Sequence, residues 1–264
     1  MPDAVVIGAG PNGLVAANLL ADRGWDVVVL EAQDAPGGAA KSAELVEPGF
    51  VNDVFSAFYP LGVAWDAEDA RRAGTVHVAE GVDSLTVQAA QLALGLVPDP
   101  LFLIIGQQGL ADPSRAPAGK QAVWAYTHVP QHVRGDAGDS GITGAWDEAE
   151  AEAMADRVEA EIELLAPGFR ALVRGRHVLT PRSLEAADAN LVGGATNGAT
   201  GQLHQQLVFR PVAGLGRAET PVRGLFLGSS SAHPGGGVHG ACGANAARAA
   251  LLGDRLRLRR TRRT

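Results

Sequence analysis

The N-terminal stretch "AVVIGAGPNGLVAANLLADRG" constrains the fold more strongly than any other part of the chain. Residues 4–7 are an apolar, β-branched run, which predicts a buried strand. Gly8, Gly10 and Gly13 follow with Gly-x-Gly-x-x-Gly spacing, and an apolar helical pattern then covers residues 14–22. A strand, a glycine turn and a helix in this order predict the start of a βαβ unit.

A second apolar run, "WDVVVLE", predicts the next strand and ends at Glu31, 18 residues after Gly13. This spacing matches the dinucleotide-binding fingerprint, in which the acidic side chain binds ribose hydroxyls. Gly8 permits the tight turn, Gly10 lets a pyrophosphate approach the backbone, and Gly13 allows close packing of helix on strand. The helix N-terminus adds free N–H groups and a partial positive charge. The alternative is an ordinary strand–turn–helix without a ligand.

A second glycine cluster lies near the other end of the chain, in "GLFLGSSSAHPGGGVHGACGANAARAAL". Residues 224–229 predict a strand, and residues 235–240 lead into an alanine-rich helical pattern. Bare glycine backbone can approach a flat ring, and the helix N-terminus can stabilise negative charge on a reduced flavin. The first motif fits NAD and FAD alike, because both contain ADP. The second cluster favours FAD over the alternative of an NAD(P)-binding reductase. An extended FAD needs a second binding site for its isoalloxazine ring, and this cluster can provide it.

The segments "VVIGAGPNGLVAANLLADRGWDVVVLEAQDAPGGAA" and "GLFLGSSSAHPGGGVHGACGANAA" together resemble the flavin-dependent phytoene desaturase and carotenoid isomerase-like oxidoreductases, within the wider amine-oxidase-type FAD superfamily. "DPSRAPAGKQAVWAYTHVP" and "ITGAWDEAEAEAMADRVEAEIELLAPGF" resemble the substrate-domain half of that family. The resemblance implies an α/β fold, with a Rossmann-like FAD-binding domain and a reduced α+β substrate domain inserted into it. It also implies hydride transfer to the flavin from an apolar, polyene- or lipid-like substrate. A non-catalytic flavin-binding remnant or partner subunit is the alternative.

The resemblance further implies residues that bind each end of FAD. Gly37 and Gly38 match the second Gly-Gly contact of the family, whereas Ser229 stands where many flavoproteins carry an acidic residue. His233 and His239 are the catalytic candidates, and each could instead make a local hydrogen bond that holds its loop. No metal site is expected. The predicted cofactor-binding residues are Gly8, Ala9, Gly10, Pro11, Asn12, Gly13, Glu31, Ala32, Gly37, Gly38, Ala39, Gly228, Ser229, Gly236, Gly237, Val238 and His239.

The same resemblance implies two domains, and the charge of the last ten residues defines a basic tail. Residues 1–64 and 215–254 would form a discontinuous FAD-binding domain, residues 70–214 a reduced substrate or cap domain, and residues 255–264 the tail. Members of the family are much longer than this chain, and the missing segment falls near residues 64–70.

Loss of that segment predicts apolar surface near residues 55–65 and along "LFLIIG", residues 101–106. A large exposed apolar patch usually marks a partner site, and two-fold dimers are the commonest way to cover one. We therefore expect either a homodimer or a shallow site with solvent-accessible flavin.

The central region alternates between strand and helix patterns. Residues 75–81, 101–108 and 121–129 predict strands, and residues 84–96 predict a helix between the first two. Residues 171–179 are a further candidate strand. Other segments are expected to be irregular or short: a turn at 35–38, a linker or short helix at 65–74, and loops at 137–144 and 193–201.

A long helix is predicted after Asp147, which forms a capping box with Glu150. Its apolar positions recur at helical spacing, and its acidic residues would then be mostly solvated. The apolar positions are Ala151, Met154, Val158, Ile162 and Leu165, and the acidic ones include Glu152, Asp156, Glu159 and Glu163.

Several other reactive residue types have ordinary structural explanations. His128 and His132 lack the acidic or cysteine neighbours of a metal site, so a loop or strand edge is the preferred interpretation. Cys242 is expected to pack as a small residue. The serines at 229–231 form no Gly-x-Ser-x-Gly elbow, which argues against a hydrolase. Trp124 and Tyr126 alternate in a strand and would either line an apolar pocket or pack.

Composition limits the cellular setting and the partners. The single cysteine rules out an internal disulfide and fits the cytoplasm, and no apolar run reaches the ~20 residues of a membrane span. The net charge is −7, yet the last ten residues hold six arginines and no acidic residue. This tail predicts weak peripheral contact with anionic membranes, or else a frayed, solvated end, and no specific nucleic-acid binding.

Overall fold

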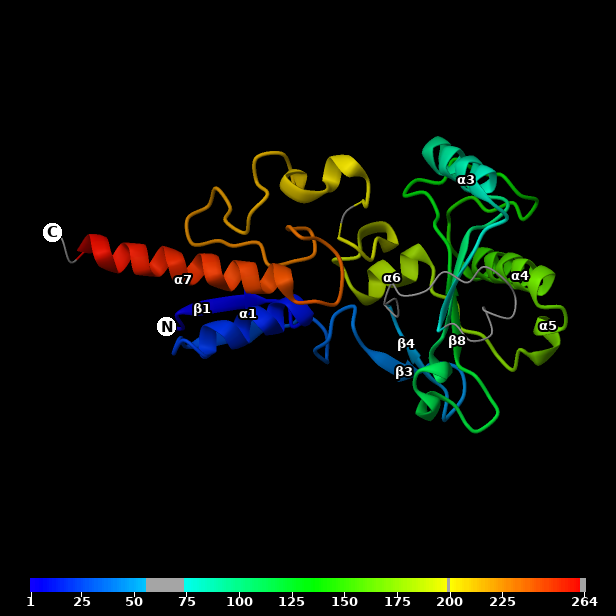
Figure 1. Cartoon of the computed structure of the whole chain (residues 1–264), viewed down its shortest axis with the longest axis horizontal. Helices are drawn as coiled ribbons and strands as arrows, with labels where there is room; N and C mark the ends of the chain where they lie inside the picture. Colours follow the sequence, from blue (N-terminus) through cyan, green and yellow to red (C-terminus); the bar gives the residue numbers. More distant parts are fainter. Residues whose placement is uncertain (56–73, 199, 262–264) are drawn as a thin grey trace. The chain divides into compact units, whose positions relative to one another are not determined.

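The computed structural model describes residues 1–55, 74–198 and 200–261, with side chains described up to residue 256. The predicted linker at 65–74 therefore falls almost wholly outside the described residues. The chain forms two compact units (Figure 1). The first unit contains residues 1–41 and 187–264, and the second contains residues 42–186.

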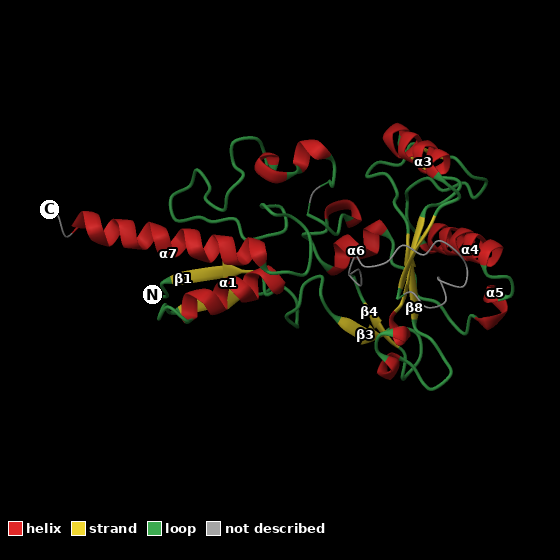
Figure 2. Cartoon of the chain, viewed as in Figure 1, coloured by secondary structure: helices red, strands yellow, loops and turns green. Residues whose placement is uncertain are grey.

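The first unit is built on the predicted strand–helix–strand start. Strand β1 (Ala4–Ile7) pairs in parallel with β2 (Val27–Leu30), and helix α1 (Pro11–Ala21) connects them. Helix α1 begins earlier than the apolar pattern predicted, because Pro11 at the first helical position already has the helical φ. Helix α7 (Ala241–Thr261) runs beside α1 and β1 (Figures 1 and 2).

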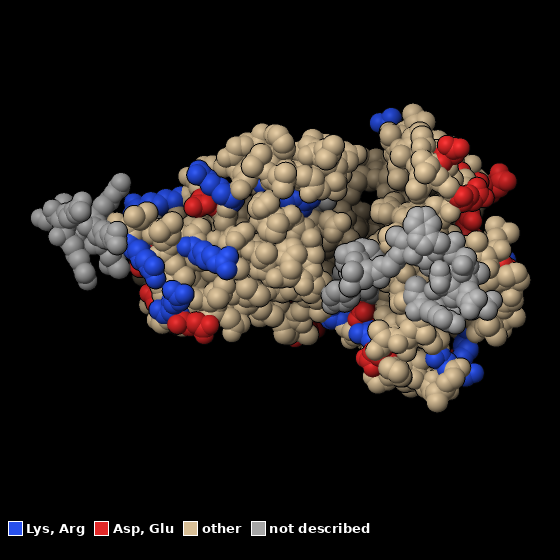
Figure 3. Space-filling view, in the orientation of Figure 1, with Lys and Arg blue, Asp and Glu red and all other residues tan. Residues whose placement is uncertain are grey.

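Small side chains let these helices come close together. Ala16, Leu20 and Ala247 form the buried cluster of the first unit. The predicted basic tail does not begin as a separate segment at residue 255, since α7 continues to Thr261. Figure 3 shows Lys and Arg side chains over the part of this unit that carries α7.

One face of the β1–β2 pair is open among the described residues, contrary to the prediction of buried strands. Val5 pairs with Val28 and Ile7 with Leu30, so the four side chains share a face. Ile7 is 85% exposed and Leu30 is 52% exposed. The helices cover the opposite face, where Ala4 and Val27 pack against the buried cluster.

Most of the first unit between residues 187 and 240 is irregular. It contains the 3-10 turns η3 (Val192–Gly194), η4 (Leu203–Gln205) and η5 (Leu207–Phe209). The predicted strand at 224–229 is wrong: only an isolated bridge joins Glu219 and Phe226. An apolar segment of this length forms a strand only where a neighbouring strand pairs with it. Among the described residues, this segment has a single bridge as its pairing.

The second unit contains a three-stranded antiparallel sheet that confirms three predicted strands. Its order is β5 (Thr75–Val78), β7 (Leu103–Gln107) and β8 (Val123–Tyr126), with β7 central. The predicted helix is α3 (Val82–Leu94). Smaller elements complete the unit: hairpin β3 (Ser42–Glu44) with β4 (Val51–Asp53), parallel pair β6 (Leu96–Val97) with β9 (Gly135–Asp136), and turns η1 (Gln108–Leu110) and η2 (Pro113–Arg115).

The long predicted helix is α4 (Glu148–Leu165), and Asp147 caps it by accepting from the Glu150 N–H at 3.0 Å. Of the predicted capping box the structure has the Asp147 half, whereas the Glu150 carboxylate bonds the preceding loop instead. It accepts from the N–H groups of Trp146, Thr143 and Gly144, and so fixes the preceding loop. Met154 and Ile162 are buried as predicted, but Leu165 is 57% exposed because it lies in the last turn.

One other prediction for this region is wrong, and another holds only in part. Residues 171–179 form no strand, because α5 (Phe169–Leu172) takes the first part and an irregular segment leads to α6 (Pro181–Ala187). The acidic side chains Glu152 and Asp156 of α4 are exposed as predicted, but three acidic residues of this helix also bind Arg176. These residues are Glu152, Asp156 and Glu159, and the fourth, Glu163, accepts from the N–H groups of Gly168 and Arg170.

The core of the second unit contains the segment that we expected to be exposed. Leu101, Leu103 and Ile104 are at most 5% exposed, because β7 is the central strand and α4 packs near its start. The patch expected near residues 55–65 lies, beyond Phe55, outside the described residues. A buried ion pair joins Arg157 to Asp136 at 2.7 Å beside this core.

The units divide the chain at other points than the predicted domain boundaries. Residues 42–55 belong to the second unit, where Asp53 pairs with Arg115 and Glu47 with Arg174. Residues 187–214 belong to the first unit, held there by the buried side chain of Arg210. No helix among the described residues is long and apolar enough to cross a membrane.

Candidate functional site

The glycine loop at the start of α1 has the geometry of a strand-to-helix turn. Gly8 has φ +94° and donates its N–H to the Leu30 carbonyl oxygen at 2.7 Å, which extends the β1–β2 ladder by one bond. Gly10 is the N-cap of α1, followed by Pro11. The first N–H groups of a helix have no partner within the helix, so this end offers donors to an anion.

Gly13 and Gly10 differ in what surrounds them. A Cβ atom at Gly13 would lie 2.0 Å from the Gly8 carbonyl oxygen, so only glycine lets α1 pack this closely on the loop. At Gly10 a Cβ atom would meet nothing nearer than the Gly38 Cα atom at 3.8 Å, an ordinary contact. The fold therefore requires glycine at position 13, whereas at position 10 it leaves the space open.

The second predicted Gly-Gly pair lies directly against this loop. Gly37 donates its N–H to the Ala9 carbonyl oxygen at 3.0 Å. Gly38 has φ +54°, and a Cβ atom there would lie 3.0 Å from the Gly10 Cα atom. Ala9 is buried and Ala39 is half-buried, while Ala32 is exposed.

Glu31 reaches back from the end of β2 to the same loop. Its carboxylate accepts from the Ala9 N–H at 2.6 Å and from the Gln33 N–H at 2.9 Å. The N–H groups of Gln33 and Ala9 lower the pKa of the Glu31 carboxyl. An ionised carboxylate can accept about four hydrogen bonds, so acceptor positions remain for the ribose hydroxyls predicted here.

The second glycine motif packs against the first. A Cβ atom at Gly243 would lie 1.8 Å from the Asn12 carbonyl oxygen, and one at Gly240 would lie 2.5 Å from the Val15 side chain. The Gly243 N–H also donates to the Asn12 side-chain oxygen at 3.5 Å. The two glycine-rich helix starts, more than 200 residues apart in the sequence, therefore meet in one unit (Figure 1).

We call residues 235–238 the ring-side turn, because they were predicted to face the flavin ring. Gly236, Gly237 and Val238 are exposed, whereas Gly235 is buried. Gly236 abuts Asn197, whose Oδ1 atom would be 2.5 Å from a Cβ atom at Gly236. Gly228 packs near Ala246 of α7. Ser229 is exposed, and its hydroxyl accepts from the Ser231 N–H.

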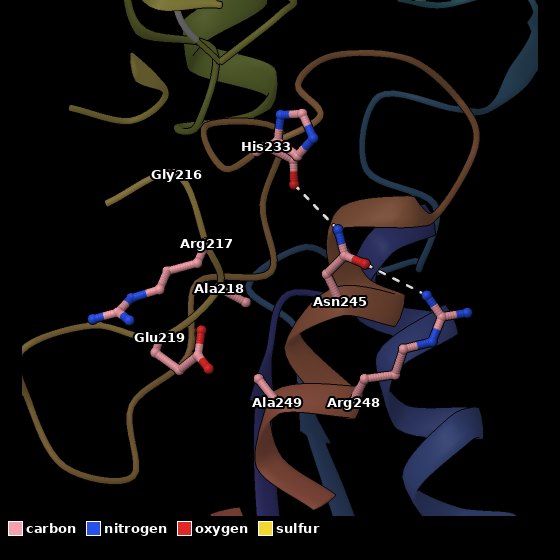
Figure 4. A pocket seen from close by; sticks show the side chains of 8 residues that line it. All are labelled: Gly216, Arg217, Ala218, Glu219, His233, Asn245, Arg248 and Ala249. Atoms are coloured by element: carbon pink, nitrogen blue, oxygen red, sulfur yellow. Dashed lines mark hydrogen bonds between the residues drawn. The ribbon is translucent and has the colours of Figure 1, made fainter. Parts of the chain in front are cut away.

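The two histidines differ in their surroundings. His239 accepts the Ala241 N–H at Nδ1, at 3.0 Å, and so holds the start of α7 by a local hydrogen bond. The His233 carbonyl oxygen accepts from the Asn245 amide, while its buried Nδ1 atom has no partner among the described residues. Figure 4 shows the His233 ring directed away from Asn245.

A cavity of about 290 Å³ lies beside His233 in the first unit (Figure 4). The segment around Ala218 faces α7 across it. Figure 4 shows the guanidinium of Arg217 directed away from the cavity and that of Arg248 beside Asn245. The lining residues are Gly216, Arg217, Ala218, Glu219, His233, Asn245, Arg248 and Ala249.

Two buried residues of this unit have clear structural roles. Cys242 is fully buried, and burial raises the pKa of its thiol, in keeping with the predicted packing role. Arg210 is 2% exposed and donates to four backbone carbonyl groups, and sequence reasoning missed it. The one available signal was a lone arginine inside the apolar run "LVFRPV".

The remaining predicted residues belong to the second unit. Trp124 stacks on Tyr126 within β8, and His128, just after β8, stacks on Phe102, just before β7. His132 is exposed. Among the residues that the structure describes, no three His, Cys, Asp or Glu side chains gather as a metal site would require.

Comparison with known proteins adds independent information. Residues 6–67 match the family model described as an NAD(P)-binding Rossmann-like domain. The chain is 36% identical over 185 residues to "Pyridine nucleotide-disulfide oxidoreductase domain-containing protein 2" of Rattus norvegicus, covering 69% of this chain and 30% of that protein. It is 28% identical over 144 residues to the putrescine oxidase of Kocuria rosea, covering 54% and 27%.

A shorter match concerns the flavin-containing amine oxidase B of Cavia porcellus, which is 61% identical over 36 residues, or 14% of this chain and 7% of that protein. The chain thus spans 30% of the rat protein and 27% of the putrescine oxidase.

Proposed function

We propose that this chain belongs to the FAD-dependent amine-oxidase-type superfamily and is an oxidoreductase that holds FAD between its two glycine motifs. The predicted FAD cofactor is confirmed at the level of the superfamily, because a Rossmann-like model matches residues 6–67 and the relatives include a flavin-containing amine oxidase. The phytoene desaturase-like assignment and the apolar, polyene- or lipid-like substrate remain part of the proposal.

The observation that carries the proposal is the open position at Gly10. Packing accounts for glycine at positions 13, 240 and 243, where a Cβ atom would come within 2.5 Å of another atom. Gly10 has an ordinary φ of −72° and room for a side chain, so the fold does not explain its glycine. A pyrophosphate at the N-terminus of α1 does explain it, because the phosphate needs the backbone itself.

The residues present fit FAD at both ends. The loop at Gly8–Gly10 and the Gly37–Gly38 pair form a side-chain-free surface at the start of α1. The ionised Glu31 carboxylate lies at the end of β2, where ribose binds in this motif. The exposed ring-side turn precedes the N-terminus of α7, which would stabilise negative charge on the pyrimidine side of the ring.

Bound FAD supplies the redox chemistry by accepting a hydride equivalent from the substrate. The residues of this chain bind and orient the cofactor. His239 keeps the turn before α7 in place through its bond to Ala241. His233 stays the candidate for a direct hydrogen bond, since its Nδ1 atom is a buried group of the first unit without a partner among the described residues.

The Gly10→Ala variant tests the assignment. Its Cβ atom fits the protein at 3.8 Å from Gly38, so the apoprotein should lose only the N-cap preference for glycine over alanine, about 0.5–1 kcal/mol. It would nevertheless occupy the space of the pyrophosphate, and FAD content after purification should fall at least about tenfold, a loss of about 1.4 kcal/mol. The bulkier Gly10→Val should abolish FAD retention.

Gly201→Ala is the matched control, because Gly201 lies in the same unit and a Cβ atom there would meet nothing within 4 Å. FAD is released by heat and quantified per chain for the parent and for each variant. Equal FAD content in the parent, Gly10→Ala and Gly10→Val would show that the site assignment is wrong.

A further inference from the structure

Arg210 lies at the centre of the hydrogen bonds behind the ring-side turn. Its Nη1 atom donates to the Ser230 carbonyl oxygen at 2.7 Å and to that of Asn197 at 3.1 Å. Its Nε atom donates to Gln205 at 2.9 Å, and its Nη2 atom donates to Thr200 at 2.8 Å. A single side chain thus joins the 197–205 segment to the 228–231 segment.

The ring-side turn rests on this cluster at two successive glycines. A Cβ atom at Gly235 would lie 3.3 Å from Cζ and Nη1 of Arg210, so the guanidinium is directly behind this residue. Gly236 rests on Asn197, the residue whose carbonyl group Arg210 holds. Movement of Arg210 would therefore move both glycines.

The charge of Arg210 has no acidic partner in the described part of the chain. All of its hydrogen bonds there go to neutral carbonyl groups, and no described carboxylate forms an ion pair with it. Burying a cation without a counter-ion is costly. The same burial strengthens its attraction to any negative charge that appears nearby, because the surroundings are less polarisable than water.

We propose that Arg210 is a positioning residue for the ring-side turn and that its positive charge stabilises the reduced, anionic flavin. Two-electron reduction of FAD with uptake of one proton leaves one negative charge on the ring system. The inference rests on the proposed function, since it takes the flavin ring to lie against the turn. Arg210 would thus help to set the redox potential of the bound flavin, although it lies outside both glycine motifs.

The test measures the two-electron reduction potential of bound FAD by anaerobic dye equilibration in the parent and three variants. In Arg210→Gln the preference for reduced over oxidised FAD should fall about tenfold, which lowers the potential by about 30 mV for a two-electron couple. Arg210→Lys keeps the charge and should stay within about threefold of the parent preference, although it loses the planar set of donors. Arg223→Gln removes an exposed charge from the same unit and should leave the potential unchanged.

A purely structural role for Arg210 would lower the unfolding midpoint of both Arg210 variants and leave their potentials equal to that of Arg223→Gln, which would overturn the inference. If Arg210→Gln does not fold, sulfite binding to the parent holoprotein can still overturn the inference. Sulfite adds to flavin N5 and leaves a negative charge on the ring, so the protein should bind it at least about tenfold more tightly than free FAD does. Equal sulfite affinity would overturn the inference. A chain that binds no FAD would overturn the proposed function as well.

Discussion

Replacement of Gly243 by alanine should separate the two helices that bring the glycine motifs together. The new Cβ atom would lie 1.8 Å from the Asn12 carbonyl oxygen and 2.6 Å from its carbonyl carbon. Both are backbone atoms of α1, so no side-chain rotation relieves the overlap. Helix α7 must therefore move away from α1, and the buried contact of Ala247 with Ala16 and Leu20 loosens with it.

Two opposing terms set the size of the effect. Overpacking a closely packed site costs about 1–3 kcal/mol, and a clash with backbone belongs at the upper end of that range. Alanine inside a helix is favoured over glycine by about 1 kcal/mol. The expected net loss is about 2 kcal/mol, which in a protein of this size lowers the unfolding midpoint by about 4–8 °C.

Gly253 in the same helix provides the matched control. A Cβ atom there would meet nothing within 4 Å, so Gly253→Ala keeps the helix-propensity gain without the clash. It should raise the midpoint by about 2–4 °C. Thermal unfolding followed by circular dichroism compares the two variants with the parent. A Gly243→Ala protein that is stabilised as much as Gly253→Ala would refute the close contact of α1 with α7.

Two other predictions concern acid and the C-terminal segment. Burial opposes ionisation of Asp136, but hydrogen bonds from Arg157 and two backbone N–H groups outweigh it and lower the pKa of the carboxyl. The ion pair thus stabilises the fold above the unfolded-state pKa of about 3.9, and this stability is lost as pH falls through the lower folded-state pKa. Asp136→Asn should remove that part of the acid transition in a pH titration of unfolding, and an unchanged transition would contradict the assignment. For the arginines of residues 255–264, sedimentation with anionic liposomes should show salt-sensitive binding worth about 1 kcal/mol per arginine near the surface. Equal binding after removal of residues 255–264 would refute a membrane role.

Local patterns predicted the elements that carry their own start and stop signals. The strand–turn–helix at residues 4–21 and the Asp147 cap of α4 depend on contacts within a few residues, and the structure has both. Strands depend on distant partners. The segment 101–108 contains β7, which pairs with two neighbouring strands, whereas the similarly apolar segment 224–229 has only a single bridge among the described residues.

The site was predictable only in part, for a related reason. Glycine spacing and Glu31 identified the loop, because their roles follow from local backbone geometry. Arg210 acts through carbonyl groups of Asn197 and Ser230, and a carbonyl group is present at every residue of a sequence. The amino-acid sequence alone therefore does not indicate which carbonyl groups the arginine contacts in the folded chain.

The glycines of the two motifs separate into those that the fold needs and two, Gly10 and Gly228, that it does not. Gly13 and Gly243 are sites of backbone contact, and Gly8, Gly37 and Gly38 have positive φ values that favour glycine. These residues would be glycine in a protein that binds nothing, so they are weak evidence for a ligand. Gly10 has neither requirement, which makes it the residue whose replacement separates binding from folding. Loss of FAD from a Gly10→Ala protein of nearly unchanged stability would therefore say more about function than loss of FAD from any variant at the tightly packed positions.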